Sequence, residues 1–418
     1  MRRPNLSPLA LASLMLPLLA ACGGGAPKVE APASVTAHYR ASLQLPGGEL
    51  PFGLELDEKD GKLSAVIVNG PERLDAEDVA RDGERITMRL PGYRNVIDLT
   101  PEGGILRGKL TMVKSGNLRQ EIPLVAMRGD SYRFFPAAVP PGADIGGRWA
   151  VTFVEDNGAE AIAVGEFSQS GSDVTGTFLS ATGDHRYLSG EMRGGELFLG
   201  SFNGGQTFLY HATVAADGTL SGDYWSGLAY HARFKARRDE NASLGDTVRM
   251  TSVRDPSQRL KFSFPDLAGT PVSIEDPRFA GKVVVVAISG SWCPNCHDEA
   301  AFLSQYYREN RDKGFEVVGL MFEHFDVPAE AKVAVEGYRD RNKVEFPLLI
   351  AGITGETASS RLPQLDAVHA YPTTLFVDRK GKVRYVHTGF SGPATGAHYV
   401  ELTREFDERI KALLAEPT

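Results

Sequence analysis

Cysteine is scarce in this chain, with three among 418 residues. This scarcity excludes a small fold held together by several disulfides. The nine histidines are scattered without the spacing of metal ligands, so we expect neither a metal nor another cofactor. Blocks of basic residues are absent and the formal net charge is −8, which argues against nucleic acid as a partner.

Long apolar runs are also lacking, except for one at the N-terminus. Met1-Arg2-Arg3 precedes an apolar stretch, residues 9–21, that is too short to span a bilayer comfortably. This pattern is typical of a secretory signal, which we place at residues 1–22. Leu19-Ala20-Ala21-Cys22 resembles the bacterial lipobox. That resemblance implies a lipid on Cys22 and a protein anchored in the bacterial envelope, facing the periplasm. The alternative is an ordinary membrane anchor with an incidental cysteine.

The chain after the signal is long enough for two or three domains. Residues 23–36 are rich in Gly, Ala and Pro and predict a flexible tether. Apolar and polar residues then alternate on both sides of a glycine-containing turn at 57–61, which is typical of antiparallel hairpins. Such patterns fill residues 37–135 and 145–240, with a Pro-rich linker between them. We therefore predict one or two antiparallel all-β units, each a barrel or a sandwich.

The two β-rich stretches share short motifs in the same order. Gly61-Lys62-Leu63-Ser64 and Ser172-Asp173-Val174-Thr175 fall early in their halves. Gly104-Ile105-Leu106-Arg107-Gly108 and Gly218-Thr219-Leu220-Ser221-Gly222 fall late. The pattern favours diverged copies of one unit, although unrelated β-hairpins share such compositions too.

Residues 248–418 alternate between strand and helix patterns, which indicates an α/β domain. Residues 282–288 are apolar almost throughout and predict a central strand buried on both faces. The other expected elements are a hairpin over 261–274, helices over 296–313 and 328–342, strands over 315–322, 346–350, 373–377 and 382–387, and a C-terminal amphipathic helix.

Cys293-Pro294-Asn295-Cys296 lies between the central strand and the next helix. A cysteine at a helix start is favoured as a thiolate by unpaired backbone N–H groups and the helix dipole, which suits attack on disulfides. We predict a redox-active disulfide in which Cys293 attacks and the less exposed Cys296 resolves. The alternative is a static structural bridge, but it would close too short a loop to stabilise the fold much.

The order of elements and Trp292-Cys293-Pro294-Asn295-Cys296 resemble the thioredoxin fold and its active-site motif. Within that superfamily, the chain is most similar to exported TlpA-type disulfide reductases, over residues 250–416. Three features carry the resemblance: the hairpin ahead of the central strand, Glu299 three residues after the second cysteine, and residues 387–393 after the last hairpin. Residues 182–188 and 221–227 also look like the β-module ahead of some TlpA-type domains.

The resemblance implies reduction of disulfide-containing protein substrates, with a membrane thiol-transfer protein as electron donor. It implies a cis-proline at Tyr371-Pro372 facing the cysteines, with the Tyr371 backbone pairing with bound substrate. Trp292 and Pro294 are expected beside the same substrate. An ordinary proline at a strand entry and a core Trp remain the alternatives.

Glu299 has two readings. A partly buried carboxylate one turn beyond Cys296 could exchange a proton with that cysteine. A first-turn Glu could instead complement the helix dipole. Thioredoxins carry a buried Asp six residues before the first cysteine, where this chain has Ala287, so a carboxylate base has to come from elsewhere. Ala300-Ala301 replace the proline that TlpA-type proteins often have, which puts the usual helix kink in doubt.

Cys293 to His297 also fit C-x-x-C-H, the attachment signature of c-type haem. A preceding buried strand and a missing distal ligand argue against haem, and we expect His297 to be a solvated first-turn residue. Peroxidases of the peroxiredoxin type need a Thr where Gly290 stands. For Glu323-His324, at a strand end, we favour solvated loop groups over a lining of the substrate groove.

A different class of function also remains. The chain could be a lipid-anchored binding or scaffold protein whose accessory redox domain serves one partner. Turnover on a general disulfide such as insulin distinguishes the two classes.

Overall fold

The computed structural model describes residues 35–245 and 251–417. The predicted signal, the lipobox Cys22 and almost all of the tether lie outside these residues. Among the described residues, no helix is long and apolar enough to cross a membrane.

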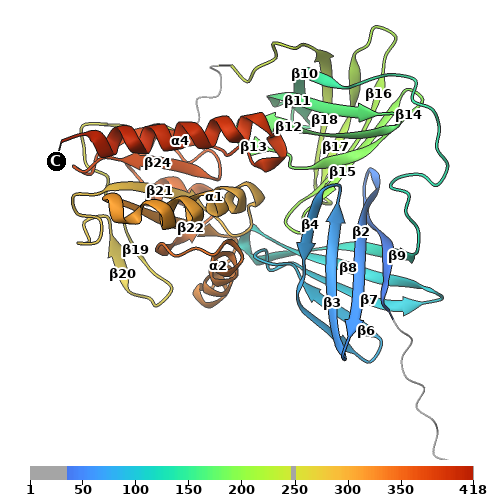
Figure 1. Cartoon of the computed structure of the whole chain (residues 1–418), viewed down its shortest axis with the longest axis horizontal. Coiled ribbons are helices and arrows are strands. Elements are labelled where there is room, and N and C mark those ends of the chain that lie inside the picture. The colour runs from blue at the N-terminus through green and yellow to red at the C-terminus, as the bar shows by residue number, and fades with distance from the viewer. Residues whose placement is uncertain (1–34, 246–250, 418) are drawn as a thin grey trace, which may run out of the picture. The chain divides into compact units, whose positions relative to one another are not determined.

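The first β unit is a nine-stranded antiparallel meander (Figure 1). Its strands are β1 (Ala37–Leu45), β2 (Gly48–Lys59), β3 (Lys62–Asn69), β4 (Glu72–Asp75), β5 (Glu77–Asp82), β6 (Arg85–Arg89), β7 (Val96–Glu102), β8 (Ile105–Lys114) and β9 (Leu118–Arg128). The first and last strands, β1 and β9, pair with each other. The edge strands β4 and β5 are separated in sequence only by Ala76, so the sheet curls round into a barrel-like unit.

Local sequence sets the register of this unit. Leu54 and Leu56 on β2 face Ile67 and Ala65 on β3, and all four side chains are buried. The predicted turn is the two-residue connection Asp60-Gly61, whose φ angles are 53° and 74°. Positive φ at both central positions is the requirement of the tight hairpin turn that matches strand twist.

The second β unit is a closed eight-stranded barrel with one short extra strand, β13. Its strands are β10 (Gly147–Glu155), β11 (Glu160–Ser170), β12 (Asp173–Ser180), β13 (Gly183–Asp184), β14 (Leu188–Arg193), β15 (Glu196–Phe202), β16 (Thr207–Val214), β17 (Leu220–Ser226) and β18 (Tyr230–Arg238). Closure comes from the pairings of β10 with β18 and of β11 with β12. Buried aromatic side chains such as Phe153, Phe178 and Tyr210 fill the interior.

The two β units share one strand order. In each, the first strand pairs with the second and the last, and the short fourth strand pairs with the third. The motifs at residues 61–64 and 172–175 fall at the turn between the second and third strands of their units. Those at 104–108 and 218–222 fall around the start of the eighth strands. Chain order and pairing therefore agree with the predicted repeat.

The C-terminal domain is built on a five-stranded mixed sheet in the order β23-β22-β21-β24-β25. The strands are β21 (Val283–Ser289), β22 (Phe315–Glu323), β23 (Leu348–Ile353), β24 (Thr373–Val377) and β25 (Val383–Thr388), and the helices are α1 (Pro294–Asn310), α2 (Pro328–Asn342), α3 (Glu356–Arg361) and α4 (Ala397–Ala415). The strands β19 (Ser263–Pro265) and β20 (Pro271–Ser273) form a separate hairpin. Three 3₁₀ turns cover residues 115–117, 311–313 and 393–395.

The central strand β21 is buried along its whole length, as predicted. Val283, Val285 and Ala287 pack with residues of α1, α2 and α4. The alternate side chains of β21 pack with α3 and the β19–β20 hairpin. The strand expected at 346–350 begins at Leu348 and runs to Ile353, and the helix expected over 296–313 runs from Pro294 to Asn310. The short helix α3 was not predicted, because six residues carry too little periodicity.

Candidate active site

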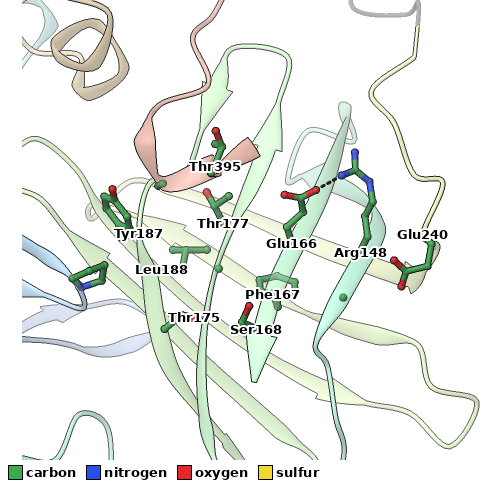
Figure 2. Close-up of a pocket in the computed structure, with 15 residues that line it drawn as sticks. Arg148, Glu166, Phe167, Ser168, Thr175, Thr177, Tyr187, Leu188, Glu240 and Thr395 are labelled. Carbon is green, nitrogen blue, oxygen red and sulfur yellow. Dashed lines mark hydrogen bonds and ion pairs between the residues drawn. The ribbon is translucent and has the colours of Figure 1, made fainter. Parts of the chain in front are cut away.

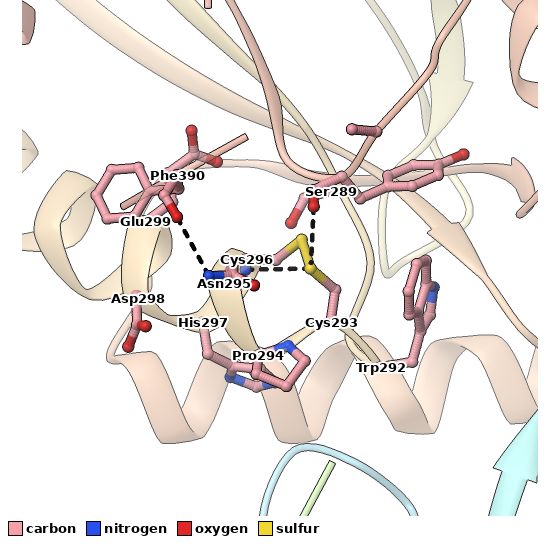
Figure 3. The surroundings of a disulfide bond; sticks show 12 residues. Ser289, Trp292, Cys293, Pro294, Asn295, Cys296, His297, Asp298, Glu299 and Phe390 are labelled. Atoms are coloured by element: carbon pink, nitrogen blue, oxygen red, sulfur yellow. Dashed lines mark hydrogen bonds between the residues drawn. A yellow bond between two sulfur atoms is a disulfide. The ribbon is translucent and has the colours of Figure 1, made fainter. Parts of the chain in front are cut away.

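The two cysteines form a disulfide at the start of α1 (Figure 3). Cys293 is the N-cap residue of the helix and Pro294 follows at its first position, which suits a residue without an N–H. The Cys293 Sγ accepts a hydrogen bond from the Cys296 backbone N–H at 3.2 Å. The sulfur therefore already occupies the place where a helix terminus stabilises negative charge.

The peptide bond between Tyr371 and Pro372 is cis. The carbonyl oxygen of Tyr371 lies 3.4 Å from the Cys293 Sγ. The cis-proline loop and the redox pair are thus in direct contact. Trp292 flanks them. Its ring stacks on that of His324, with the ring centroids 4.5 Å apart, and lies edge-on to the ring of Tyr371, with the centroids 5.3 Å apart.

Both cysteines of the pair are buried. Cys296 is fully buried, as a resolving cysteine should be, and Cys293 is 4% exposed. The expectation that Cys296 is the less exposed of the two cysteines is therefore confirmed.

Glu299 is buried, with 1% of its surface exposed, and the Thr374 hydroxyl donates a hydrogen bond to its Oε1. Burial raises the pKa of Glu299 to about 8. Thr374 lies opposite Ala287 in the β21–β24 ladder. Glu299 therefore provides a buried carboxyl group over the strand position where thioredoxins carry their Asp. This burial agrees with the alternative in which Glu299 is a partly buried carboxylate.

His297 is buried rather than solvated, and that expectation is also wrong. Its Nε2 lies 2.8 Å from the Ser291 carbonyl oxygen, and its Nδ1 lies 2.8 Å from the Asn342 amide nitrogen. The carbonyl requires a donor at Nε2 and the amide N–H requires an acceptor at Nδ1, so the ring is neutral. Burial accordingly lowers the pKa of His297 well below its usual value. With both ring nitrogens engaged, His297 does not fit the role of a haem ligand.

Glu323 is completely buried, which overturns the expectation of a solvated loop group. It accepts hydrogen bonds from the Ser291 N–H at 2.9 Å and from the Ser291 hydroxyl at 2.5 Å. Burial raises the pKa of Glu323 to about 7. The strand end therefore braces the segment that precedes Trp292 and Cys293. The sequence clue was the position of Glu323 at the C-terminal end of a buried strand.

The second barrel contributes residues to this site that sequence reasoning missed. Asp184, in the connection between β12 and β14, accepts hydrogen bonds from the Asn295 side chain at 3.1 Å and from the Gly392 N–H at 2.6 Å. Gly183 packs so closely on Asn295 that an added Cβ would lie 2.9 Å from its side chain. The Thr182-Gly183 backbone likewise leaves no room for a side chain at Gly389. This connection therefore covers the faces of residues 295 and 389–392 beside the disulfide.

Arg186 joins all three folded units. Its guanidinium donates hydrogen bonds to Asp298 on α1 and, at 2.5 Å, to Glu72 on β4 of the first unit. All three side chains are largely buried. A weaker contact of 3.4 Å reaches the carbonyl oxygen of Pro294, which is itself buried.

A cavity of about 740 Å³ lies elsewhere, away from the disulfide (Figure 2). It lies against the outer wall of the second barrel and residues 394–396, and neither cysteine lines it. Glu166 there is paired with both Arg148 and His398. The charge of Glu166 in this cavity is thus compensated by neighbouring side chains.

Comparison with known proteins places the resemblance in the C-terminal part. Residues 257–386 match the model of the AhpC/TSA family. Thiol-disulfide oxidoreductase ResA of Halalkalibacterium halodurans is 27% identical over 154 residues, which cover 36% of this chain and 78% of that protein. ResA of Bacillus subtilis is 28% identical over 138 residues, which cover 33% and 69%. A solved thiol:disulfide interchange protein of the thioredoxin family from Chlorobium tepidum aligns with 20% identity and a TM-score of 0.30, over 39% of this chain and 100% of that chain.

The C-terminal domain is thioredoxin-like, and two antiparallel all-β units precede it. This confirms the predicted fold class. The domain holds a Cys-x-x-Cys pair at bonding distance, with Cα atoms 5.2 Å apart. Such a pair can exchange two electrons between dithiol and disulfide.

Proposed function

We propose that this chain is a lipid-anchored thiol–disulfide oxidoreductase of the TlpA type that reduces protein disulfides outside the cytosol. The observation that carries the proposal is the Cys293–Cys296 disulfide at a helix start beside the cis peptide of Pro372. The relatives named thiol-disulfide oxidoreductase support the same chemistry.

The reaction starts from the reduced pair. The Cys293 thiolate attacks one sulfur of the substrate cystine, a mixed disulfide forms, and the other substrate sulfur leaves as a thiolate. The Cys296 thiolate then attacks the Cys293 sulfur and releases the second substrate thiol. Two electrons have passed to the substrate, and the Cys293–Cys296 disulfide remains. A membrane thiol-transfer protein is the expected donor that reduces it again.

Glu299 fits a role in proton exchange with Cys296. The Cys296 thiol has to lose its proton before it attacks, and Glu299 lies one helical turn further along α1. A carboxyl group with a pKa of about 8 is close to an ordinary thiol, so the proton can pass in either direction at little cost.

A peroxidase of the peroxiredoxin type is disfavoured by the space around Gly290. A Cβ at this position would lie 2.4 Å from the Trp292 indole nitrogen and 2.7 Å from the Phe322 carbonyl oxygen. The threonine that such peroxidases need has no room there. Trp292 would have to leave the carbonyl to which it donates a hydrogen bond.

Trapping experiments test the proposal directly. A Cys296→Ser variant expressed in cells should accumulate mixed disulfides through Cys293, visible as reducible high-mass species. The Cys293→Ser variant is the matched control and should form none. If the Cys296→Ser variant forms no mixed disulfide with any protein, Cys293 is not the attacking nucleophile and the proposal fails.

The low exposure of Cys293 is also consistent with the other class of function, a binding or scaffold lipoprotein. A scaffold or binding lipoprotein with an accessory redox domain would reduce one partner and leave insulin untouched. We expect insulin to be reduced with multiple turnovers, because Cys293 is shielded by loops rather than enclosed within the sheet. Lack of turnover on insulin, together with one trapped partner, would favour the scaffold.

Lipid anchoring is tested separately. A Cys22→Ala variant should lose incorporation of labelled palmitate and move from the membrane to the soluble periplasmic fraction. Unchanged labelling would place the lipid elsewhere, and an unchanged membrane location without label would favour an ordinary N-terminal anchor.

A further inference from the structure

The mouth of the second barrel contains a cavity of about 510 Å³. The cavity lies at the end of the barrel where the β10–β11, β12–β14, β15–β16 and β17–β18 connections meet. Small barrels of eight strands are wide enough to hold one small group at such a mouth. The lining comes mainly from this barrel, with contributions from the first unit and from the redox domain.

Apolar and aromatic side chains form the inner wall. Phe153, Phe208 and Tyr224 are buried and line the cavity. At the rim, Ile162 is 48% exposed and Tyr230 is 40% exposed. Large apolar groups at the edge of a cavity favour an apolar or aromatic occupant.

Several polar groups of the cavity lack partners. The Oε1 atoms of Gln120 and Gln206 are buried and accept no hydrogen bond from any residue that the structure describes. Lys114 forms no ion pair with any described residue, and desolvation lowers its pKa. Unpaired acceptors suit N–H donors, and a partly buried cation suits a carboxylate.

The cavity borders the redox site through one residue of the Cys293–Cys296 turn. Asn295, the residue just before Cys296, lines it. Asp184 lines it as well and accepts a hydrogen bond from Asn295. An occupant of the cavity therefore lies next to the Cys293–Cys296 turn. A polypeptide segment of another protein could supply all three groups that the cavity suits: an apolar side chain, backbone N–H donors and a carboxylate.

We propose that the barrel mouth binds the protein substrate, taking up an aromatic side chain close in sequence to the substrate cystine, with an acidic neighbour paired to Lys114. The inference rests on the proposed function and names its substrate class. The second barrel then acts as a specificity element, because it offers the thioredoxin-like domain a pocket that the domain alone does not have.

Peptide reduction measures this preference. The probes are eleven-residue peptides with a central cysteine in disulfide linkage to free cysteine, with Phe-Glu scanned through the four positions on each side and Ala-Ala as reference. In the wild-type protein we expect kcat/KM to rise about tenfold at the best position, from burial of one ring. In Tyr230→Ala the ratio of Phe to Ala peptides should fall to about one. In the Lys114→Gln variant, replacing the Glu of the peptide by Gln should no longer change kcat/KM.

Matched controls lie on exposed positions elsewhere. Tyr385→Ala, a similarly exposed tyrosine on β25, and Lys62→Gln on β3 should keep the wild-type ratios. If the wild-type protein reduces the Phe-Glu peptides with the same kcat/KM as the Ala-Ala peptide at every position, the inference is overturned. Thermal unfolding of each variant reports whether the barrel stays folded.

A second measurement separates this inference from the proposed function. Fluorescence anisotropy of a labelled peptide with serine in place of cysteine reports binding without any redox step. If the wild-type protein reduces no peptide but still binds the Phe-Glu peptide through Tyr230 and Lys114, the reductase proposal fails and the pocket stands. If reduction proceeds without Phe preference and without binding, only the pocket is refuted.

Discussion

Arg186 of the second barrel forms a buried ion pair with Asp298 of α1, two residues after Cys296 of the redox disulfide. The same guanidinium also pairs with Glu72 of the first unit. A single side chain thus fixes both β units to the helix that carries the cysteines. Reactivity of Cys293 should depend on this contact.

Replacement of Arg186 by Met should expose the redox pair. Removing one partner of a buried ion pair costs about 3–5 kcal/mol and leaves Asp298 and Glu72 without compensation, so the barrel connection should open. We expect the reduced Cys293 to react with iodoacetamide at least about tenfold faster, because each 1.4 kcal/mol corresponds to a factor of ten. Mass spectrometry locates the label.

Arg85→Met is the control, because Arg85 forms an exposed pair with Asp98 that contributes little. The double variant Arg186→Met/Asp298→Asn should be less destabilised than Arg186→Met, since one uncompensated charge is gone. Equal alkylation rates for Arg186→Met and Arg85→Met would show that the ion pair does not limit access.

Glu299→Gln should change how stability depends on pH. The pKa of Glu299 rises from an ordinary value of 4.5 when unfolded to about 8 when folded, because of burial. Between these values the folded protein keeps a proton that the unfolded chain releases. Glu299 therefore lowers the free energy of unfolding by about 1.4 kcal/mol per pH unit as pH rises from 4.5 towards 8.

Urea unfolding at a series of pH values measures this slope. Glu299→Gln should make the free energy of unfolding fall less steeply with rising pH. The contributions of the other buried carboxyl groups to this fall should remain. The same variant should lose a pH-dependent step in Cys296 resolution, seen by stopped-flow. Identical slopes in both proteins would show that Glu299 is ionised in the fold.

Gly290→Ala should destabilise the protein although alanine is otherwise a mild substitution. The added Cβ would collide with the Trp292 ring and the Phe322 carbonyl, and overpacking of this kind costs about 1–3 kcal/mol. Gly195→Ala is the matched control, since its nearest neighbour would be the Val214 carbonyl oxygen at 3.9 Å. Thermal denaturation compares the two variants. Equal midpoints would mean that the Trp292 ring moves aside without a cost in stability.

Ser291→Ala should weaken the brace under the cysteine segment. The hydroxyl donates a 2.5 Å hydrogen bond to the fully buried Glu323, and the loss leaves a carboxylate oxygen unsatisfied at a cost of about 1–3 kcal/mol. Ser64→Ala removes an exposed hydroxyl and should change the unfolding free energy little. If both variants unfold at the same urea concentration, Glu323 is satisfied without Ser291.

Local pattern was sufficient for much of the fold. The Asp60-Gly61 turn, the all-apolar strand β21 and the helix after Cys293 follow from short-range rules, because hairpin turns, buried strands and helix starts each leave a mark within a few residues. The Cys-x-x-Cys pair was likewise recognisable from its motif, and the cis peptide before Pro372 was expected from the resemblance to the thioredoxin fold.

Burial of Glu323 and His297 could not be predicted from the sequence, and for Glu299 a partly buried carboxylate was only one of two alternatives. Glu299, Glu323 and His297 all occupy positions that favour solvent by default, and each is buried because residues far along the chain supply partners: Thr374, Ser291 and Asn342. A carboxyl or imidazole group enters the interior only where such a partner exists, and that partner is fixed by packing.

The sequence by itself determined the chemistry, since a cysteine at a helix start is activated by its own local backbone. Only the tertiary structure decided how accessible the cysteine pair is. The hydrogen-bond partners of Asn295 and Asp298 are Asp184 and Arg186, which lie more than a hundred residues earlier in the chain. Contacts at that separation depend on how whole domains pack, and no local pattern of residues encodes them.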